Sequence, residues 1–212
     1  MAERPAQARK GHRWFAALYD TMNRLSGTEP KFLAKHRPYI AGEANGRVLE
    51  IGAGTGASLP YYTKAETVVA TEPDPYMLER ARKRLDELGL THIELSQHPA
   101  EHLGFDDHSF DHVVSVVVLC SVRDLRQSLA EVKRVLKPDG SFRFVEHVRF
   151  ESGLKGRIQD LITPVQRWLF AGCHPNRRTL NAIVDAGFEV QDLQRYSMSP
   201  IHPVIVGVAR PR

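Results

Sequence analysis

A short apolar run that ends in three closely spaced glycines constrains this chain more than any other feature. Residues 48–51 predict a buried strand, and Gly52, Gly54 and Gly56 follow it at alternate positions. Glycine has no Cβ, so a ligand can approach the backbone closely and φ can be positive. A strand, a glycine turn and a helix start together present free N–H groups to the acceptors of a ligand. The stretch therefore predicts a nucleotide-type pocket in an α/β fold.

Two carboxylates beside this turn narrow the choice of ligand. Gly52, Gly54 and Ala57 satisfy a dinucleotide-binding pattern, and Glu72 lies where that pattern expects a ribose-binding acid. Glu50, however, would repel a pyrophosphate and would favour a ligand with positive charge near the loop. S-adenosylmethionine (SAM) carries an ammonium, a sulfonium and a ribose, so it gives both acids a partner. A nicotinamide oxidoreductase, and a non-catalytic SAM- or nucleotide-binding module, are the alternatives.

The composition is that of an ordinary soluble protein of one domain. Of 212 residues, 42% are hydrophobic and 25% are charged, and the formal net charge is +4. The two cysteines are too few for a disulfide framework and predict reduced thiols in a cytoplasmic protein. No apolar run reaches the ~20 residues of a membrane span. Lys and Arg are scattered along amphipathic helices, which predicts no nucleic-acid partner.

Strands and helices alternate along the chain. Strands are expected at residues 47–51, 67–71, 92–96, 110–118 and 141–147, and helices at 30–40, 58–64, 75–88 and 124–136. A helix at 177–186 and two closing strands at 187–196 and 204–209 complete the pattern. Such alternation predicts a doubly wound, mostly parallel α/β sheet.

The first 45 residues are expected to form a helical cap on a domain of residues 46–212. Within the cap, apolar residues recur at helical spacing from Trp14 to Leu25. We favour a helix that packs over the pocket, with Tyr19 as a candidate acceptor contact. The alternative is weak contact of residues 9–25 with a membrane surface, because cations precede the stripe.

A second amphipathic stretch, at about 154–175, does not alternate with a buried strand. Pro164 interrupts it, so a kinked helix is expected, and we interpret it as a lid over the pocket. Trp168, Cys173 and His174 are its candidate substrate contacts.

The pocket itself is expected where the parallel strands end. In a doubly wound sheet, ligands bind beyond the carboxyl ends of the strands, at the switch point beside the first strand. Five patches should therefore converge there: Gly52–Gly56, Glu72, Gln97–Glu101, Val118–Ser121 and Glu146–His147.

Several of these segments resemble motifs of the class I SAM-dependent methyltransferases. The resemblance covers about residues 35–150 and rests on 50–56, 72–78, 100–111 and 135–140. It implies a seven-stranded sheet with a reversed final hairpin, SAM as cofactor and S-adenosylhomocysteine as product. The candidate cofactor-binding residues are Glu50, Gly52, Ala53, Gly54, Gly56, Glu72, Pro73, Met77, Pro99, Ala100, Glu101 and Val118. Pro99 departs from the family pattern, in which an acid bonds the adenine amino group, so backbone groups near Ala100 and Glu101, or Gln97, would recognise adenine.

A narrower similarity suggests the acceptor. Residues 118–122, 144–148 and 169–173 look like the microsomal alkyl-thiol methyltransferases of the methyltransferase-like seven group and their bacterial relatives. A small, apolar alkyl thiol is therefore the sharpest hypothesis. Bacterial phospholipid N-methyltransferases share the general pattern, so phosphatidylethanolamine-type N-methylation at a membrane surface is the competing one.

Methyl transfer to a thiol requires loss of the thiol proton, whose unperturbed pKa is near 8.5. His147 is the first catalytic candidate, as base or as orienting residue, and His174 is a weaker one. Glu146 could hold an ammonium-bearing acceptor or fix His147. Cys120, near the expected methyl group, is interpreted as apolar packing rather than as a nucleophile.

No metal site is expected from the spacing of the histidines. The pairs His98/His102 and His108/His112 have i,i+4 spacing, but they fall in loops and no cysteine accompanies them.

Overall fold

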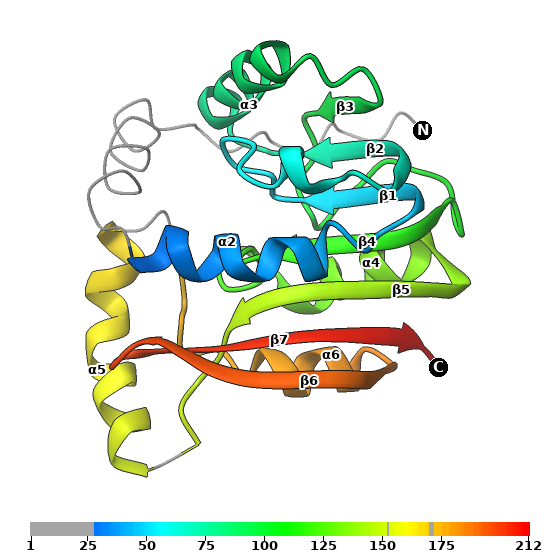
Figure 1. The fold of residues 1–212 in the computed structure, drawn as a ribbon. Coiled ribbons are helices and arrows are strands. Elements are labelled where there is room, and N and C mark those ends of the chain that lie inside the picture. Colours follow the sequence, from blue (N-terminus) through cyan, green and yellow to red (C-terminus); the bar gives the residue numbers. More distant parts are fainter. Residues whose placement is uncertain (1–27, 152, 170–171) are drawn as a thin grey trace, which may run out of the picture.

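A seven-stranded sheet with helices on both faces forms the protein (Figure 1). The computed structural model describes residues 28–151, 153–169 and 172–212. The strands are β1 (Gly46–Ile51), β2 (Ala65–Thr71), β3 (Ile93–Ser96), β4 (Phe110–Val116), β5 (Leu136–His147), β6 (Phe188–Ser199) and β7 (His202–Pro211). The helices are α2 (Thr28–Ile40), α3 (Pro75–Leu88), α4 (Leu125–Val135), α5 (Gly153–Leu169) and α6 (Thr179–Asp185), with a 3₁₀ turn, η1 (Leu59–Tyr61).

The strand order confirms the predicted doubly wound sheet. It runs β3-β2-β1-β4-β5-β7-β6, and the first five strands pair in parallel. β7 is antiparallel to both β5 and β6, which gives the reversed final hairpin. From β1 the chain first adds β2 and β3 on one side of the sheet, and then returns to add β4 on the other side of β1. The strand order therefore reverses between β1 and β4, which is the switch point. Ligands of such sheets bind at the carboxyl ends of these strands.

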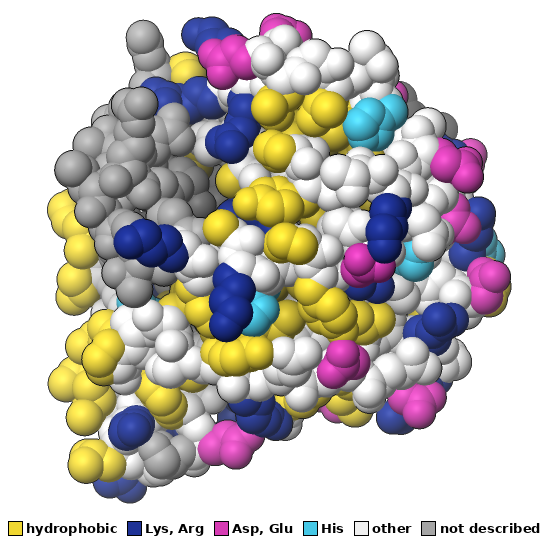
Figure 2. All heavy atoms as spheres, in the orientation of Figure 1, with side chains coloured by type: hydrophobic (Ala, Val, Ile, Leu, Met, Phe, Trp, Pro, Cys, Tyr) yellow, Lys and Arg dark blue, Asp and Glu magenta, His cyan; other side chains and the backbone are white. Residues whose placement is uncertain are grey.

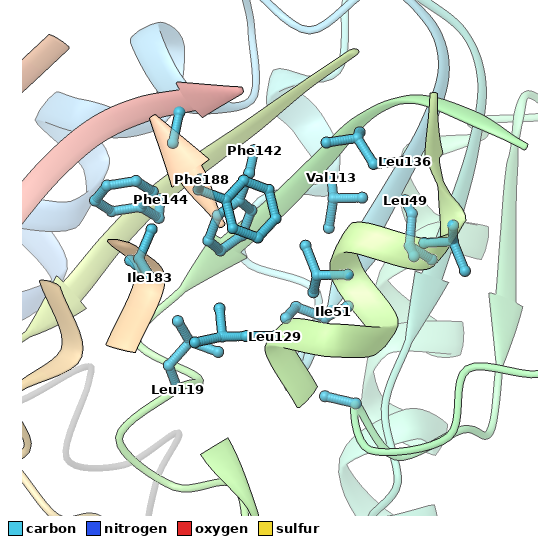
Figure 3. Close-up of a cluster of buried hydrophobic side chains, with 14 of the residues drawn as sticks. Leu49, Ile51, Val113, Leu119, Leu129, Leu136, Phe142, Phe144, Ile183 and Phe188 are labelled. Atoms are coloured by element: carbon cyan, nitrogen blue, oxygen red, sulfur yellow. The ribbon is translucent and has the colours of Figure 1, made fainter. Parts of the chain in front are cut away.

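Successive side chains of a strand point to opposite faces of the sheet, so the core has two layers. On β1, Leu49 and Ile51 pack with α4 and α6, whereas Val48 packs with α2. Figure 3 shows the first layer, in which Leu129 of α4 and Ile183 of α6 meet the side chains of the sheet. Because central strands are buried on both faces, their sequences are nearly continuous apolar runs, as the predicted parallel sheet requires.

The helix boundaries agree with the predicted ranges to within one residue for α3 and α4, and capping residues fix them. The carboxylate of Asp74 accepts hydrogen bonds from the backbone N–H groups of Tyr76 and Met77, and Pro75 occupies the first turn of α3. Gly89 ends α3 in the left-handed conformation, with φ of 63°. Asp124 caps α4 through the N–H of Gln127. These predictions are confirmed.

Two predicted elements are shorter in the structure. Residues 58–64 do not form a helix: only η1 is helical, because β2 begins at Ala65 and leaves no room for further turns. β4 ends at Val116 rather than at residue 118, because Val117 has a φ of +59° and turns the chain out of the sheet. This turn shapes the site described below.

α5 differs from the predicted lid in the side toward which its apolar stripe faces. The helix runs through Pro164 without a break, and its apolar stripe faces outward instead of covering a pocket. Leu154, Leu161 and Trp168 are 74–79% exposed among the described residues. The side chains that α5 buries are mostly polar: Gln159, Thr163 and Gln166, beside Gly156. Trp168 is therefore largely exposed on the outer side of α5, and its contact with a substrate stays a prediction.

The inward polar face of α5 is explained by its hydrogen bonds. The Gln159 amide donates to the carbonyls of Val148 and Pro175 and accepts from the N–H of Phe150. Figure 1 shows α5 standing across the side of the sheet toward which β1 and β2 point, and Figure 2 shows hydrophobic side chains along that margin. No described helix combines the length and apolarity needed to cross a bilayer.

The predicted cap lies mostly outside the described residues. α2 is its described part and packs over the sheet through Leu33 and Ile40. Residues 9–25, the proposed membrane contact, and Tyr19 fall among residues 1–27, which the structure does not describe.

Candidate active site

The glycine loop after β1 has the conformation that its sequence predicts. Gly52 has a φ of 61°, and a Cβ there would lie 2.6 Å from Cγ1 of Val118. Gly54 has a φ of 60°, but a Cβ there would meet no heavy atom within 4 Å. The loop is therefore closed against the β4 side at Gly52 and open at Gly54, where a ligand could approach the backbone.

Glu72, at the end of β2, holds this loop. Its Oε2 accepts a 2.9 Å hydrogen bond from the N–H of Gly54, and its Oε1 accepts one of 2.9 Å from Asp74. The N–H of Ala53 donates to the carbonyl of Thr71, also at the end of β2. A carboxylate is thus fixed beside the open glycine, as the ribose-binding hypothesis requires.

The segment that follows Glu72 stays next to the predicted adenine region. The carbonyl of Pro73 accepts a hydrogen bond of 3.2 Å from the side-chain amide of Gln97. Met77 lies in the first turn of α3 and is buried. The structure brings these residues to the same edge of the sheet; their contact with a cofactor stays a prediction.

Glu50 lies beneath the glycine loop rather than on its surface. It is 2% exposed, and it faces the α2 layer, where Arg37, Ser58 and Tyr62 are its polar neighbours. Burial raises the pKa of Glu50, and these three neighbours oppose that shift. Glu50 thus already has a positively charged partner in the chain, Arg37. The attraction of Glu50 for the ammonium of a cofactor stays a prediction.

Pro99, Ala100 and Glu101 form a turn after β3. The carbonyl of Pro99 accepts from the N–H of His102, and Ala100 is buried in the core. The carboxylate of Glu101 accepts hydrogen bonds from the N–H groups of Arg123 (2.6 Å) and Asp124 (3.2 Å). Its side chain therefore fixes the start of α4 against this turn, a role that the sequence interpretation did not foresee.

Glu146 organises the turn after β4, a role that the sequence interpretation did not give it. The side chain is fully buried, and its carboxylate accepts from the N–H groups of Val118 (3.0 Å) and Leu119 (3.1 Å). The hydroxyl of Ser115 donates to the same carboxylate at 2.5 Å. Burial raises the pKa of Glu146, while these donors favour its ionised form. Its bonds hold the backbone that Val117 turns through a positive φ, so it positions this loop. Its contact with an acceptor, or with His147, stays a prediction.

Three side chains from distant segments meet beside this turn. The Sγ atoms of Cys120 and Cys173 are 3.3 Å apart, and Nδ1 of His147 is 3.9 Å from Sγ of Cys173. The three potential ligand atoms all lie within 4.8 Å of one another. We call these residues the Cys–His–Cys cluster. Sequence reasoning named each member separately but missed the cluster, because residues 120, 147 and 173 have no regular spacing.

Hydrogen bonds around the cluster fix its loops. The N–H of His174 donates to the carbonyl of Cys120 at 2.7 Å. The guanidinium of Arg177 donates to the carbonyls of Leu119 and Val122. Contact with Cys173 and burial raise the pKa of Cys120 well above its ordinary value, which agrees with its interpretation as a packed thiol and not a nucleophile. His174 contributes its backbone here and lies outside the group of three.

Comparison with known proteins identifies the family. A family model described as a methyltransferase domain matches residues 49–144. The chain is 30% identical over 93% of its length to a phosphatidylethanolamine N-methyltransferase of Cereibacter sphaeroides, and covers 94% of that protein. It is 32% identical to the human thiol S-methyltransferase TMT1B, over 92% of this chain and 83% of the relative. The chain belongs to the class I SAM-dependent methyltransferases.

The fold of this methyltransferase agrees with that assignment. The crystal structure of YcgJ from Bacillus subtilis superposes with a TM-score of 0.73 at 20% identity, over 85% of this chain and 97% of that one. The cofactor is SAM, and the open backbone at Gly54 beside the Glu72 carboxylate fits its ribose. The nicotinamide oxidoreductase and the non-catalytic binding module considered from the sequence are set aside by the family assignment.

Proposed function

We propose that this methyltransferase methylates the sulfur of a small, apolar alkyl thiol. The observation that carries the proposal is the Cys–His–Cys cluster. Each member belongs to a segment that resembles the alkyl-thiol methyltransferases, and the three residues converge within 4.8 Å at the ends of β4 and β5. Relatives named thiol S-methyltransferase, at 32–33% identity, support the same acceptor class.

The chain's own residues would do two things for this reaction. When bound, SAM supplies an electrophilic methyl group on a sulfonium. The glycine loop and Glu72 would hold the cofactor at the end of β1, and the turn kept in place by Glu146 would orient the acceptor beside it. Fixing the two reactants in line supplies much of the rate enhancement of such a displacement.

His147 is the residue best placed to manage the thiol proton. It ends β5, is 6% exposed, and its Nδ1 lies 3.9 Å from Sγ of Cys173. A free alkyl thiol with a pKa near 8.5 is mostly protonated at neutral pH, so a nearby imidazole would accept its proton or orient its sulfur. Burial of Cys120 and Leu119 keeps bulk water from this side of the site.

The acceptor class is tested with purified protein, SAM and matched acceptors. Alkyl thiols, alcohols and amines of equal chain length are compared, and S-adenosylhomocysteine and the methylated products are measured by mass spectrometry. The proposal expects methyl sulfides at rates at least tenfold above the oxygen and nitrogen products. A His147→Gln variant should lose roughly 10²–10⁴-fold in kcat, while His112→Gln, at the other end of β4, should retain activity. Equal rates for all three acceptors, or none with thiols, would contradict it.

A second candidate function is N-methylation of a phospholipid headgroup at a membrane surface. The specific observation is the outward stripe of α5: Leu154, Ile158, Leu161, Val165 and Trp168. Its spacing of three and four residues makes one continuous apolar face, and the exposed cations Lys155, Arg157 and Arg167 lie on the same helix. Such helices bind in the interface between lipid headgroups and acyl chains. The Cereibacter relative, named for a phospholipid substrate, supports this candidate.

Vesicle flotation distinguishes the two functions. Vesicles of phosphatidylethanolamine with an anionic phospholipid are floated with the wild type and with the double variant Leu161→Ser/Trp168→Ser. Leu88→Ser, a half-exposed leucine of α3, serves as the matched control. The lipid function expects flotation that only the double variant loses, together with methylated headgroups. If the wild type neither floats with the vesicles nor methylates the headgroups, the lipid function is contradicted and the thiol remains the proposed acceptor.

A further inference from the structure

We propose that the Cys–His–Cys cluster is a zinc site with an open fourth position for the acceptor thiol. The inference deepens the proposed thiol methylation. The identity of the fourth ligand rests on that proposed function, whereas the three-ligand metal site does not depend on it. It reverses the sequence expectation of no metal, which rested on histidine pairs that lie elsewhere. His98 and His112 in those pairs bond Ser96 and Ser141 instead.

The ligand atoms have nearly the separations that zinc requires. With Zn–S near 2.3 Å and Zn–N near 2.0–2.1 Å, a tetrahedral site separates two sulfurs by about 3.8 Å and a sulfur from a nitrogen by about 3.6 Å. The observed separations are 3.3 Å for the two Sγ atoms and 3.9 Å from Sγ of Cys173 to Nδ1 of His147. The third separation, from the ring nitrogen of His147 to Sγ of Cys120, is at most 4.8 Å. Shifts of about 0.3–1.2 Å would therefore complete three bonds to one ion.

The chemistry of the cluster favours zinc over hard cations. Thiolate and imidazole ligands are those that zinc prefers, and no carboxylate belongs to the group. The thiols are not joined, since 3.3 Å is far longer than the roughly 2.05 Å of a disulfide. Two thiolates would neutralise the ion, and the Arg177 guanidinium, which feels the charge of both cysteines, would stabilise them.

The segments that carry the ligands are held rigidly. His147 ends the central strand β5, and its carbonyl accepts from the hydroxyl of Thr179. Cys120 follows the turn fixed by Glu146, and its carbonyl binds the N–H of His174, next to Cys173. These bonds fix the backbone of the segments that carry the three ligands.

The described residues supply three ligands, and not a fourth. The ring of His202 lies against that of His147 at a tilt of 44°, with centroids 5.5 Å apart, but its Nε2 contacts Gln166 and its Nδ1 contacts Ser199. Within residues 28–151, 153–169 and 172–212, no other Cys, His, Asp or Glu joins the group. Three protein ligands with one open position are characteristic of catalytic zinc, whereas structural zinc has four.

An open position explains how the acceptor could be activated at neutral pH. With zinc bound, His147 would orient the acceptor sulfur through the metal and would not accept its proton. The acceptor RSH would lose that proton to solvent, by way of a buffer base, as its sulfur forms the fourth bond to zinc. A thiol that coordinates zinc is held as the thiolate. Its sulfur would then bond the methyl carbon while the bond from that carbon to the sulfonium breaks, giving the methyl sulfide, S-adenosylhomocysteine and a vacant position.

The metal site is tested without any methylation assay. The wild type is purified anaerobically without chelator, and zinc per chain is measured by mass spectrometry. The proposal expects about one zinc per chain, and at least a tenfold loss of zinc affinity in Cys120→Ser, Cys173→Ser and His147→Gln. His112→Gln, a histidine of the same sheet, is the matched control and should retain the metal. Circular dichroism and SAM binding check that each variant folds.

Cobalt reports the open position. Cobalt(II) added to the metal-free protein should give thiolate charge-transfer absorption and the intense visible bands of a four-coordinate site. An alkyl thiol should then shift those bands, and an alcohol of equal length should not. Folded, reduced wild type that binds zinc no more tightly than the double variant Cys120→Ser/Cys173→Ser would overturn the proposal, and so would a cobalt spectrum insensitive to thiol. Metal binding with a thiol-induced shift but no methyl sulfide would instead overturn the proposed function and leave the site standing.

Discussion

The carboxylate of Glu72 accepts a 2.9 Å hydrogen bond from the backbone N–H of Gly54. The bond joins the end of β2 to the glycine loop after β1, at the one loop glycine where an added Cβ would meet only open space. The acid expected to bind the cofactor ribose therefore also shapes the backbone that the cofactor must approach. Pre-formed sites of this kind avoid the cost of ordering a loop on binding.

Replacing Glu72 by glutamine should weaken SAM binding more than it weakens the fold. The amide is uncharged and has only one acceptor oxygen, so it would lose the charge-assisted hydrogen bond that the carboxylate would accept from a ribose hydroxyl, while its oxygen could still accept from one of the two backbone N–H groups. Loss of a hydrogen bond to a charged group, about 1.5–3 kcal/mol, corresponds to roughly 10–100-fold weaker binding. Calorimetric titration with SAM measures it. Glu79→Gln, at an exposed ion pair on α3, should bind like the wild type; equal weakening in both would refute the assignment.

The strain at Val117 predicts an asymmetry between two neighbouring valines. Val117 has a φ of +59°, which costs an L-residue roughly 1–2 kcal/mol and glycine almost nothing. Val118 packs against Gly52 instead. Urea unfolding should therefore find Val117→Gly about 1 kcal/mol or more less destabilising than Val118→Gly. The reverse order would mean that the turn after β4 is not strained.

The ion pair that ties α5 to the chain predicts a pH-dependent stability difference. Bonds from Arg149 and Asn176 lower the pKa of Asp160 from 3.8 to about 2. Because the pKa of Asp160 is lower in the folded state than in the unfolded state, the ionised carboxylate stabilises the fold above pH 4. This stabilisation is lost as the pH falls toward 2. The difference in melting temperature between wild type and Asp160→Asn should thus be constant from pH 7 to 5 and shrink below pH 4.

Glu151→Gln provides the control for this titration. Glu151 forms a 3.4 Å ion pair with Arg195 in which both side chains are exposed, so its melting temperature should match that of the wild type throughout. A difference between wild type and Asp160→Asn that persists unchanged to pH 2.5 would show that the ionised carboxylate is not what matters.

The sheet and the cofactor loop could be predicted because their signals are local. Apolar runs, the caps Asp74 and Asp124, and the glycines of the loop each determine structure within a few residues. The orientation of α5 could not be predicted, because its polar face is satisfied by carbonyls of Val148 and Pro175 that only the folded chain brings near Gln159. A lid with its apolar stripe inward is the simpler expectation from sequence.

The acceptor side of the site could be predicted only in part, for the same reason. Cys120, His147 and Cys173 can be recognised one by one, but their convergence depends on the turn after β4 and on the segment after α5. The structural role of Glu146 could not be predicted because its partners are the Ser115 hydroxyl and backbone N–H groups, which no sequence pattern displays. Residues whose function is to hold other residues are the ones that sequence reasoning misses here.

The central claim, that the backbone at Gly54 is where this methyltransferase receives its cofactor, is tested most directly by a matched pair of glycine variants. Gly54 and Gly89 have nearly the same positive φ, and a Cβ added at either would meet no heavy atom within 4 Å, so alanine should cost about 1 kcal/mol of stability at each. Calorimetric titration with SAM should find at least tenfold weaker binding in Gly54→Ala and unchanged binding in Gly89→Ala. Equal affinities in the two variants would contradict the account.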